Sequence, residues 1–357
     1  MTPEEKERLE ACLQEISSIL YQNTPSEEIE TLEGIEITVR EQTLAQISPK
    51  IALFFIEKQT GTRTPAKGRK RTVKSCVGSL KITKKQANRL GLESSQRRSP
   101  LLERCCLIVS ANSSYQQAEN DLKILTGIAV SHSSLQREVQ RHSFDLPDVK
   151  QKLTEVSLDG GKVRIRGAKG EKCYYKEYKT ARLQGIYYGA FFQDNLSLIN
   201  WVNSQPLANP LYCLGDGHDG IWNLFAEIGE EAQRLEILEW YHLKENLYKL
   251  EADSKLLERL ETQLWVGQIE STLALLNEVK PSGGEKFLKH LQKHRLRLIN
   301  YHQVQNEQVS SIGSGAVESA VKQIDQRLKL TGAQWNWSNV PQMLQLRCAY
   351  LNGQLAV

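Results

Sequence analysis

The sequence predicts an α/β fold, in which a mixed sheet with an all-helical insertion follows a mainly helical N-terminal region. Three observations predict it. Apolar residues recur at helical spacing before Pro147, strand-like alternation begins after it, and 357 residues are enough for two or three domains. We therefore expect a helical region at 1–60, a second region at 61–150 and an α/β domain at 151–353.

Residues 3–58 are predicted to be helical. Pro3 suits the first position of a helix, and Glu4 and Glu5 suit the positive end of its dipole. The stretch 59–71 is rich in Thr, Gly, Arg and Lys and indicates a linker. Residues 73–82 alternate well enough to predict a short strand or a hairpin.

Three helical patterns follow between residues 99 and 141. Ser99-Pro100, Ser114 and Ser131 are each typical of a helix start, and Gly127 supplies a tight turn before the third pattern. Two short helices around such a turn predict a helix-turn-helix, whose second helix would lie in the major groove of DNA. An ordinary helical hairpin is the alternative. The outward, DNA-facing residues would be Gln136, Arg137, Gln140 and Arg141.

The order of the remaining elements predicts the sheet. Strands are expected at 154–159, with alternation continuing through Val163 and Ile165, then at 174–183 and 185–193, followed by a helix at 195–203. A strand at 211–216, a helix at 220–229 and a strand at 234–239 come next. Three antiparallel strands followed by two strands alternating with helices is the order of an RNase H-like sheet. Residues from about 243 to 310 predict an all-helical insertion broken at 281–284.

Basic residues are concentrated upstream of the predicted helix-turn-helix. Between Gly61 and Arg98 there are twelve Lys or Arg residues and one acid, Glu93. Such a block suits a phosphate backbone, and a solvated linker is the alternative. The part of the block expected to contact DNA is Arg69, Lys70 and Arg71.

The seven cysteines include no C-x-x-C pair, which argues against a disulfide framework and a zinc ribbon. No apolar run approaches the roughly 20 residues of a membrane span. The acidic N-terminus lacks the features of a secretion signal. We expect a cytoplasmic protein without a membrane partner.

Three acidic residues are the candidate catalytic and metal-binding groups. Asp159 closes an apolar run before Gly160-Gly161, Asp216 closes another before Gly217, and Glu318 follows Gly313-Ser314-Gly315 and opens a helical stretch. Two carboxylates at strand ends and one on a helix can converge at the edge of a sheet. Such a cluster can hold two Mg²⁺ ions about 3.5–4 Å apart, or Mn²⁺, and support phosphodiester chemistry.

Other residues near these acids allow both functional and structural interpretations. Asp219 is the alternative ligand to Asp216, or caps the next helix. Glu239 is either an additional acid of the site or a surface carboxylate, and His242 is a structural histidine or an auxiliary group. Trp335 either stacks on unpaired bases or packs in a core, while Lys322 and Arg327 are candidate DNA contacts.

Several of these motifs together resemble bacterial insertion-sequence transposases of the DDE type, and most closely the ISKra group. The resemblance covers roughly residues 75–353. It is carried by Val156-Ser157-Leu158-Asp159-Gly160-Gly161, Gly215-Asp216-Gly217 with Trp222, Leu238-Glu239-Trp240-Tyr241-His242-Leu243-Lys244-Glu245 and Gly313-Ser314-Gly315-x-x-Glu318-Ser319. Upstream, Ser99-Pro100, Ser114-Tyr115-x-x-Ala118 and Leu125-Thr126-Gly127-Ile128-x-Val130-Ser131 contribute to it.

The resemblance implies an RNase H-like catalytic domain whose Asp-Asp-Glu triad falls on Asp159, Asp216 and Glu318. It implies Mg²⁺-dependent cleavage and strand transfer at terminal inverted repeats, with double-stranded DNA and a homo-oligomer on that DNA as partners, in the bacterial nucleoid. Two departures stand out: relatives often have Asp at the position of Glu239, and they often carry a cysteine-rich zinc element where this chain has only Cys76. A catalytically inactive DNA-binding derivative, or a nuclease without strand transfer, is the alternative.

Overall fold

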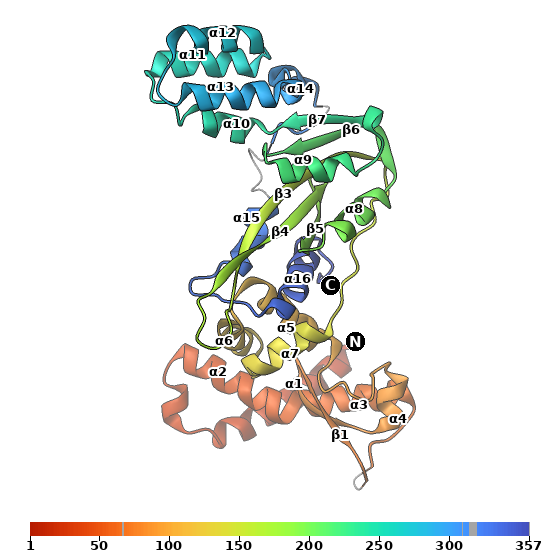
Figure 1. The fold of residues 1–357 in the computed structure, drawn as a ribbon. Coiled ribbons are helices and arrows are strands. Elements are labelled where there is room, and N and C mark those ends of the chain that lie inside the picture. Colours follow the sequence, from red (N-terminus) through yellow and green to blue (C-terminus); the bar gives the residue numbers. More distant parts are fainter. Residues whose placement is uncertain (66–67, 309, 314–319, 357) are drawn as a thin grey trace. The chain divides into compact units, whose positions relative to one another are not determined.

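A computed structural model describes residues 1–65, 68–308, 310–313 and 320–356 of the chain (Figure 1). The chain divides into two compact units. The first comprises Met1–Ser110 and Tyr115–Glu138, and the second comprises Ala111–Ser114 and Val139–Val357. Each unit is described by itself below.

The first unit begins with helices, as the sequence predicts: α1 (Pro3–Gln22), α2 (Leu32–Gln42) and α3 (Ser48–Thr60). Thr2 and Glu5 form a capping box at the start of α1, where the Thr2 hydroxyl accepts a hydrogen bond from the Glu5 amide. Helix α3 ends at Gly61, whose φ of 57° lies in the left-handed region.

A small β-hairpin follows and confirms the prediction for residues 73–82. Its strands, β1 (Arg71–Ser75) and β2 (Gly78–Ile82), pair antiparallel, and α4 (Lys84–Arg89) comes next. Val73 and Ile82 are each 1% exposed and form a core with Ala87 and Leu80, against which residues of α3 pack. The hairpin is therefore anchored on the N-terminal helices.

Three further helices, α5 (Pro100–Asn112), α6 (Tyr115–Thr126) and α7 (His132–Arg141), bear out the helical pattern predicted for 99–141. Their shared core includes Leu102, Leu122 and Leu135, all fully buried. Gly127, with a φ of 73°, begins the turn between α6 and α7. A side chain there would meet Leu44 and Arg40, so glycine is required by space as well as by backbone conformation.

The second unit is built on a mixed five-stranded sheet in the order β5-β4-β3-β6-β7. Strands β5, β4 and β3 pair antiparallel, whereas β3, β6 and β7 pair parallel. The α/β class predicted from the sequence is thereby confirmed. The strands are β3 (Leu153–Ile165), β4 (Tyr174–Leu183), β5 (Tyr187–Phe192), β6 (Leu207–Gly215) and β7 (Arg234–Leu238).

Helices cover both faces of this sheet. Gly215 of β6 lies against Ile221 and Trp222 of α9 (Asp219–Ala226), where a side chain would not fit. On the opposite face, the Tyr178 hydroxyl of β4 donates a 2.7 Å hydrogen bond to Asp325 of α15. The other helices packed on the sheet are α8 (Asn195–Asn203) and α16 (Val340–Leu351), and α15 spans Ala320–Leu328.

The predicted helical insertion lies between β7 and α15. Trp240, Trp265 and Tyr301 pack their rings together and join the insertion's core to that of the sheet. The break expected at 281–284 is present, and further breaks at 248–253 and 266–268 divide the region more finely than predicted. Its helices are α10 (Trp240–Leu247), α11 (Ser254–Trp265), α12 (Ile269–Val279), α13 (Gly284–Lys293) and α14 (Tyr301–Glu307).

One strand differs from its predicted boundary in a way that matters for the site. The sequence predicts that Asp159 ends its strand, but β3 continues through Gly160 and Gly161 to Ile165. The Tyr178 ring occupies the space that a side chain at Gly161 would fill. The two glycines therefore accommodate the neighbouring strand's side chains and do not form a turn.

None of the helices in the described residues combines the length and apolar character needed to cross a lipid bilayer.

Candidate active site

Three carboxylates follow one another across three adjacent parallel strands. Leu158 of β3 is in register with Gly215 of β6, and Gly215 is in register with Leu238 of β7. The next residues along the three strands are Asp159, Asp216 and Glu239. The Glu239 amide continues the ladder by donating a 3.0 Å hydrogen bond to the Gly215 carbonyl. Because neighbouring strands are about 4.8 Å apart, the fold brings these acids together.

The side of the sheet on which Asp159 lies is fixed by strand alternation. Residues 159 and 161 lie on the same face of β3, and Gly161 pairs with Tyr178 of β4. Because Tyr178 contacts Asp325, helix α15 covers the face to which Asp159 belongs. This helix is the one predicted to carry the third acid.

Glu318 itself lies outside the described residues, but the chain on either side of it is defined. On its N-terminal side, the Trp240 amide donates a 2.9 Å hydrogen bond to the Ile312 carbonyl. A Cβ built on Gly313 would lie 3.5 Å from Cβ of Glu239. On its C-terminal side, α15 begins at Ala320. Ile312 and Gly313 thus lie beside Glu239, while α15 packs on the sheet face to which Asp159 belongs.

The Asp159 carboxyl lies near the charges of two other acids, Glu239 and Asp216. Burial raises the pKa of this carboxyl to about 6, and the nearby charges of Glu239 and Asp216 raise it further. The Gly160 amide, which donates a 2.6 Å hydrogen bond to Oδ1, and the charge of His242 oppose this rise. A cation bound near Asp159, Asp216 and Glu239 would lower the pKa of Asp159, so that its carboxyl would ionise more readily.

His242 is the partner of Glu239. It stands in the first turn of α10, and its Nδ1 lies 3.0 Å from Oε2 of Glu239. This hydrogen bond is the largest cause of a raised pKa at His242, and the charges of Glu239, Asp159 and Asp216 act in the same direction. The i, i+3 spacing visible in the sequence is what permits the contact.

The two neighbouring candidates, Asp216 and Asp219, have different surroundings. Asp216 lies in the carboxylate line, and its Oδ1 accepts a 2.9 Å hydrogen bond from the His218 amide. Asp219 is the first residue of α9, its side chain is 68% exposed, and it forms a 2.5 Å ion pair with Lys293. The Lys293 ammonium lowers the pKa of Asp219. The register brings Asp216, and not Asp219, beside Asp159.

Sequence reasoning missed two histidines that hold the loop after Asp216. A Cβ built on Gly217 would lie 3.1 Å from the His290 ring and 3.5 Å from Nε2 of His294, both on the insertion's helical arm. His294 is 1% exposed, and burial is the main cause that lowers its pKa to about 4. Only their i, i+4 spacing on a helix was visible in the sequence, and it does not reveal a contact with a distant loop.

The predicted DNA-contacting residues of the first unit are spread over the hairpin and α7. Arg71 begins β1 and donates hydrogen bonds to the Glu93 and Ser94 carbonyls. Arg137 of α7 is exposed, while Gln136 is half-buried. Arg69 and Lys70 precede β1, and Arg141, which the division assigns to the second unit, ends α7.

Two predicted surface contacts of the second unit are instead part of its core. Arg327 is 2% exposed, and its guanidinium lies 5.0 Å from the centre of the Trp335 ring. Trp335 is 7% exposed and donates a 3.0 Å hydrogen bond to the Leu328 carbonyl. Trp335 thus packs in the core, the second of its two interpretations, and the DNA contact predicted for Arg327 is corrected, since each side chain packs on the other. Lys322 of α15 is exposed.

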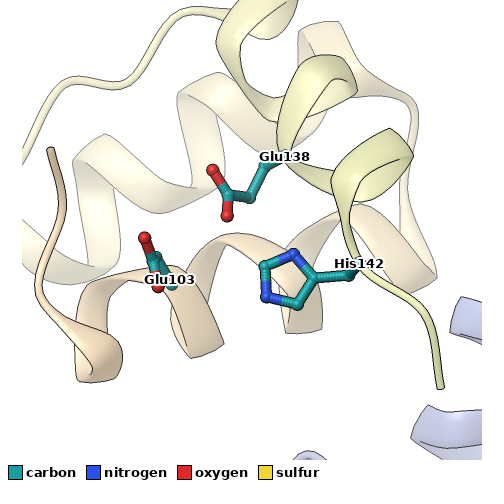
Figure 2. Close-up of side chains that lie close together, drawn as sticks. All are labelled: Glu103, Glu138 and His142. Atoms are coloured by element: carbon teal, nitrogen blue, oxygen red, sulfur yellow. The ribbon is translucent and has the colours of Figure 1, made fainter. Parts of the chain in front are cut away.

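A pair of carboxylates in the first unit was also not foreseen. Figure 2 shows Glu103 of α5 and Glu138 of α7, whose oxygens come within 4.8 Å of each other. Gln96 donates a 2.7 Å hydrogen bond to Glu103, and Arg98 forms an ion pair with Glu138, which is 4% exposed. These partners account for the two acids as structural groups. His142, labelled in the same figure, belongs to the second unit.

Comparison with known proteins does not assign the chain to a family. No protein-family model matches it, and no curated protein matches its sequence. The chemistry open to the site therefore follows from its own residues and their placement.

Proposed function

We propose that the chain is a DNA transposase of the DDE type. It would cleave phosphodiester bonds at the terminal inverted repeats of an insertion sequence and join the freed 3′ ends to target DNA. The single observation that carries the proposal is the in-register line of Asp159, Asp216 and Glu239, flanked by the segments on either side of Glu318.

The strand order supports an RNase H-like fold for this domain. The sheet runs β5-β4-β3-β6-β7, with three antiparallel strands followed by two parallel ones. In that fold the first and fourth strands are neighbours, as β3 and β6 are here. The helix after the insertion, α15, packs on the face that Asp159 belongs to. This is the topology expected from the order of elements in the sequence.

The donor set fits hard divalent cations. Asp159 and Asp216, with Glu318, would supply carboxylate oxygens, which Mg²⁺ and Mn²⁺ prefer. When bound, two such ions supply activation of the attacking oxygen and stabilisation of the leaving one. Glu239 is a further oxygen donor within the same line, and His242 orients it through the 3.0 Å hydrogen bond. Asp159 contributes in its ionised form.

The first unit supplies features suited to recognition of duplex DNA. Helices α6 and α7 are joined by a short turn at Gly127, which supports the helix-turn-helix hypothesis. The β1–β2 hairpin precedes them within the basic block. Binding of this kind weakens steeply with salt because counterions are released. Bringing two element ends together implies a homo-oligomer on DNA.

The test is Mg²⁺-dependent nicking and strand transfer on DNA that carries the sequences flanking the gene. Asp159→Asn, Asp216→Asn and Glu318→Gln should each abolish both products, and Asp219→Asn, the matched control three residues from Asp216, should retain them. Binding without nicking by the wild-type chain would identify an inactive DNA-binding derivative. Nicking without joined products would identify a nuclease, and loss through Asp219→Asn alone would overturn the assignment of Asp216.

A further inference from the structure

Strands β3 and β4 continue beyond the rest of the sheet as a two-stranded ribbon (Figure 1). Pairing between β3 and β6 ends at Leu158 and Gly215, whereas pairing between β3 and β4 continues to Ile165 and Tyr174. The two-stranded ribbon therefore starts just beyond the carboxylate line, after Tyr178, where β4 also loses its pairing with β5. Its distal part is held in place because the Arg166 amide and the Arg164 carbonyl form backbone hydrogen bonds with Trp335.

The two faces of this ribbon differ in character. One face is buried: Val163 is fully buried and Ile165 is 1% exposed. Because strand residues alternate between faces, the other face carries cations at every second position from 162 to 166. These residues, with Lys179 opposite Gly160 on β4, are named the basic row: Lys162, Arg164, Arg166 and Lys179.

Internal ion pairs do not neutralise the basic row. Glu177, the acid on this face, lies 3.8 Å from Nζ of Lys162 and 3.6 Å from Nζ of Lys179, so one carboxylate is shared by two cations. Arg164 and Arg166 form no side-chain ion pair or hydrogen bond with any residue that the structure describes. Tyr175, directly opposite Arg164, is 63% exposed.

The inner end of the row lies on the sheet face opposite the Asp159 side chain, and it reaches the helix that follows Asp216. Nζ of Lys179 would lie 2.9 Å from a Cβ on Gly160, the residue after Asp159, and 3.9 Å from a Cβ on Gly220. Gly220 belongs to the segment that follows Asp216. The Lys179 side chain, 14% exposed, thus extends from β4 to the first turn of α9, the helix that follows Asp216.

We infer that the basic row is a DNA-backbone track on the face opposite the Asp159 side chain, along which one strand passes between the sheet edge at Asp216 and the tip of the ribbon. Alternate residues of a strand are about 6.8 Å apart, so the cations form a regular line for successive phosphates. The exposed Tyr175 ring offers a surface on which a base or sugar can stack. The inference rests on the proposed function, because it assumes that the substrate at the carboxylates is DNA.

The first test compares two triple variants of the full chain with equal loss of charge. Lys162→Gln/Arg164→Gln/Arg166→Gln removes three of the four cations of the row, and Lys255→Gln/Lys286→Gln/Lys289→Gln removes three exposed lysines of the insertion. Binding of a labelled random-sequence duplex is measured against salt, with Ca²⁺ in place of Mg²⁺. We expect roughly tenfold weaker binding and a salt slope lower by about 2 to 3 for the first variant, and neither change for the second. Equal effects of the two, or none from the first, overturn the inference.

A second test does not depend on removing charge. A photoreactive phenylalanine replaces Tyr175, or Tyr248 of the insertion, which is 48% exposed and serves as the matched control. Crosslinking to the duplex at position 175 and not at 248 supports the track, and the reverse overturns it. If the chain with the photoreactive residue at 175 crosslinks but the wild-type chain does not cleave DNA with Mg²⁺, the proposed function fails while the track stands. Cleavage with no crosslink at 175 overturns only the track.

Discussion

Nδ1 of His242 lies 3.0 Å from Oε2 of Glu239, and this contact ties the first turn of α10 to the carboxylate line. Glu239 is 7% exposed, and the His242 imidazole is a hydrogen-bond partner of its carboxylate. The pair makes the insertion's first helix part of the candidate site.

Replacing His242 should lower the rate of the proposed cleavage more than it weakens DNA binding. His242→Ala leaves the buried Glu239 without its donor, a loss of about 1.5–3 kcal/mol, or roughly tenfold to a hundredfold in kcat. His242→Asn retains a donor near the position of Nδ1 and should recover part of the rate. Single-turnover kinetics with separate measurement of Kd checks this. An unchanged kcat in the alanine variant would mean that Glu239 is not used.

The stability of the metal-free protein should fall as pH rises through the titration of Asp159. Its pKa is about 6 in the folded chain and 3.8 for an aspartate side chain free in water, so the folded state favours the protonated carboxyl. The resulting stabilisation is complete below about pH 3.8 and is lost by about pH 6, for a total of about 3 kcal/mol at most. Asp159→Asn should remove this dependence and unfold at higher temperature than wild type at pH 7. Thermal melts of both proteins with EDTA between about pH 4 and 8 provide the measurement.

Gly217→Ala should destabilise the second unit more than a glycine replacement without crowding. Gly217 has a φ of 97°, and an added Cβ would meet the His290 ring and Leu238 at 3.1 Å. We expect about 2–3 kcal/mol of destabilisation, from backbone strain and displacement of α13. Gly332→Ala is the matched control, because Gly332 has a φ of 77° and nothing lies within 4 Å of an added Cβ. Urea unfolding of both variants separates the cost of backbone strain from the cost of crowding. Equal losses in the free energy of unfolding would show that α13 moves at little cost to accommodate the added Cβ.

Arg327 and Lys322, which the sequence predicts as DNA contacts, should behave differently when replaced. Arg327→Lys breaks the planar stack on Trp335 and should cost about 1–2 kcal/mol of folding free energy with little change in DNA affinity. Lys322→Gln should leave stability within about 0.5 kcal/mol and, if Lys322 contacts a phosphate, lower the salt slope by about 0.9. Calorimetry and salt-dependent binding check both. A stable Arg327→Lys protein with weakened DNA binding would restore Arg327 as a DNA contact.

Local patterns predicted the elements of the second unit well, because strand alternation and helix caps depend on residues that are close together in the sequence. The helix at Asn195–Asn203 and the strand at Tyr174–Leu183 have the bounds that the sequence predicts. The continuation of β3 through Gly160 and Gly161 could not be predicted in the same way. Two glycines indicate a turn locally, and only the Tyr178 ring from the paired strand explains why they are in a strand.

Contacts between residues far apart in the sequence also limited how much of the candidate site could be predicted. Sequence reasoning selected Asp159 and Asp216 from their position after apolar runs, and the strand register places them side by side. The contact of His294 with Gly217 depends on how the insertion folds back, which no local pattern encodes. Arg327 was predicted to contact DNA, and Trp335 was left between base stacking and core packing, because neighbouring aromatic and basic residues suit DNA as well as a buried contact.

The position of the insertion has a consequence for the order in which the protein matures on the ribosome. Strands β3, β6 and β7, which carry the acid line, are all synthesised before α10, whereas α15 follows only after α14. A nascent chain can thus complete its central sheet while the residue proposed as the third ligand has not yet been translated. Premature termination within the insertion would yield a product that contains all three strands of the carboxylate line but lacks α15 and Glu318.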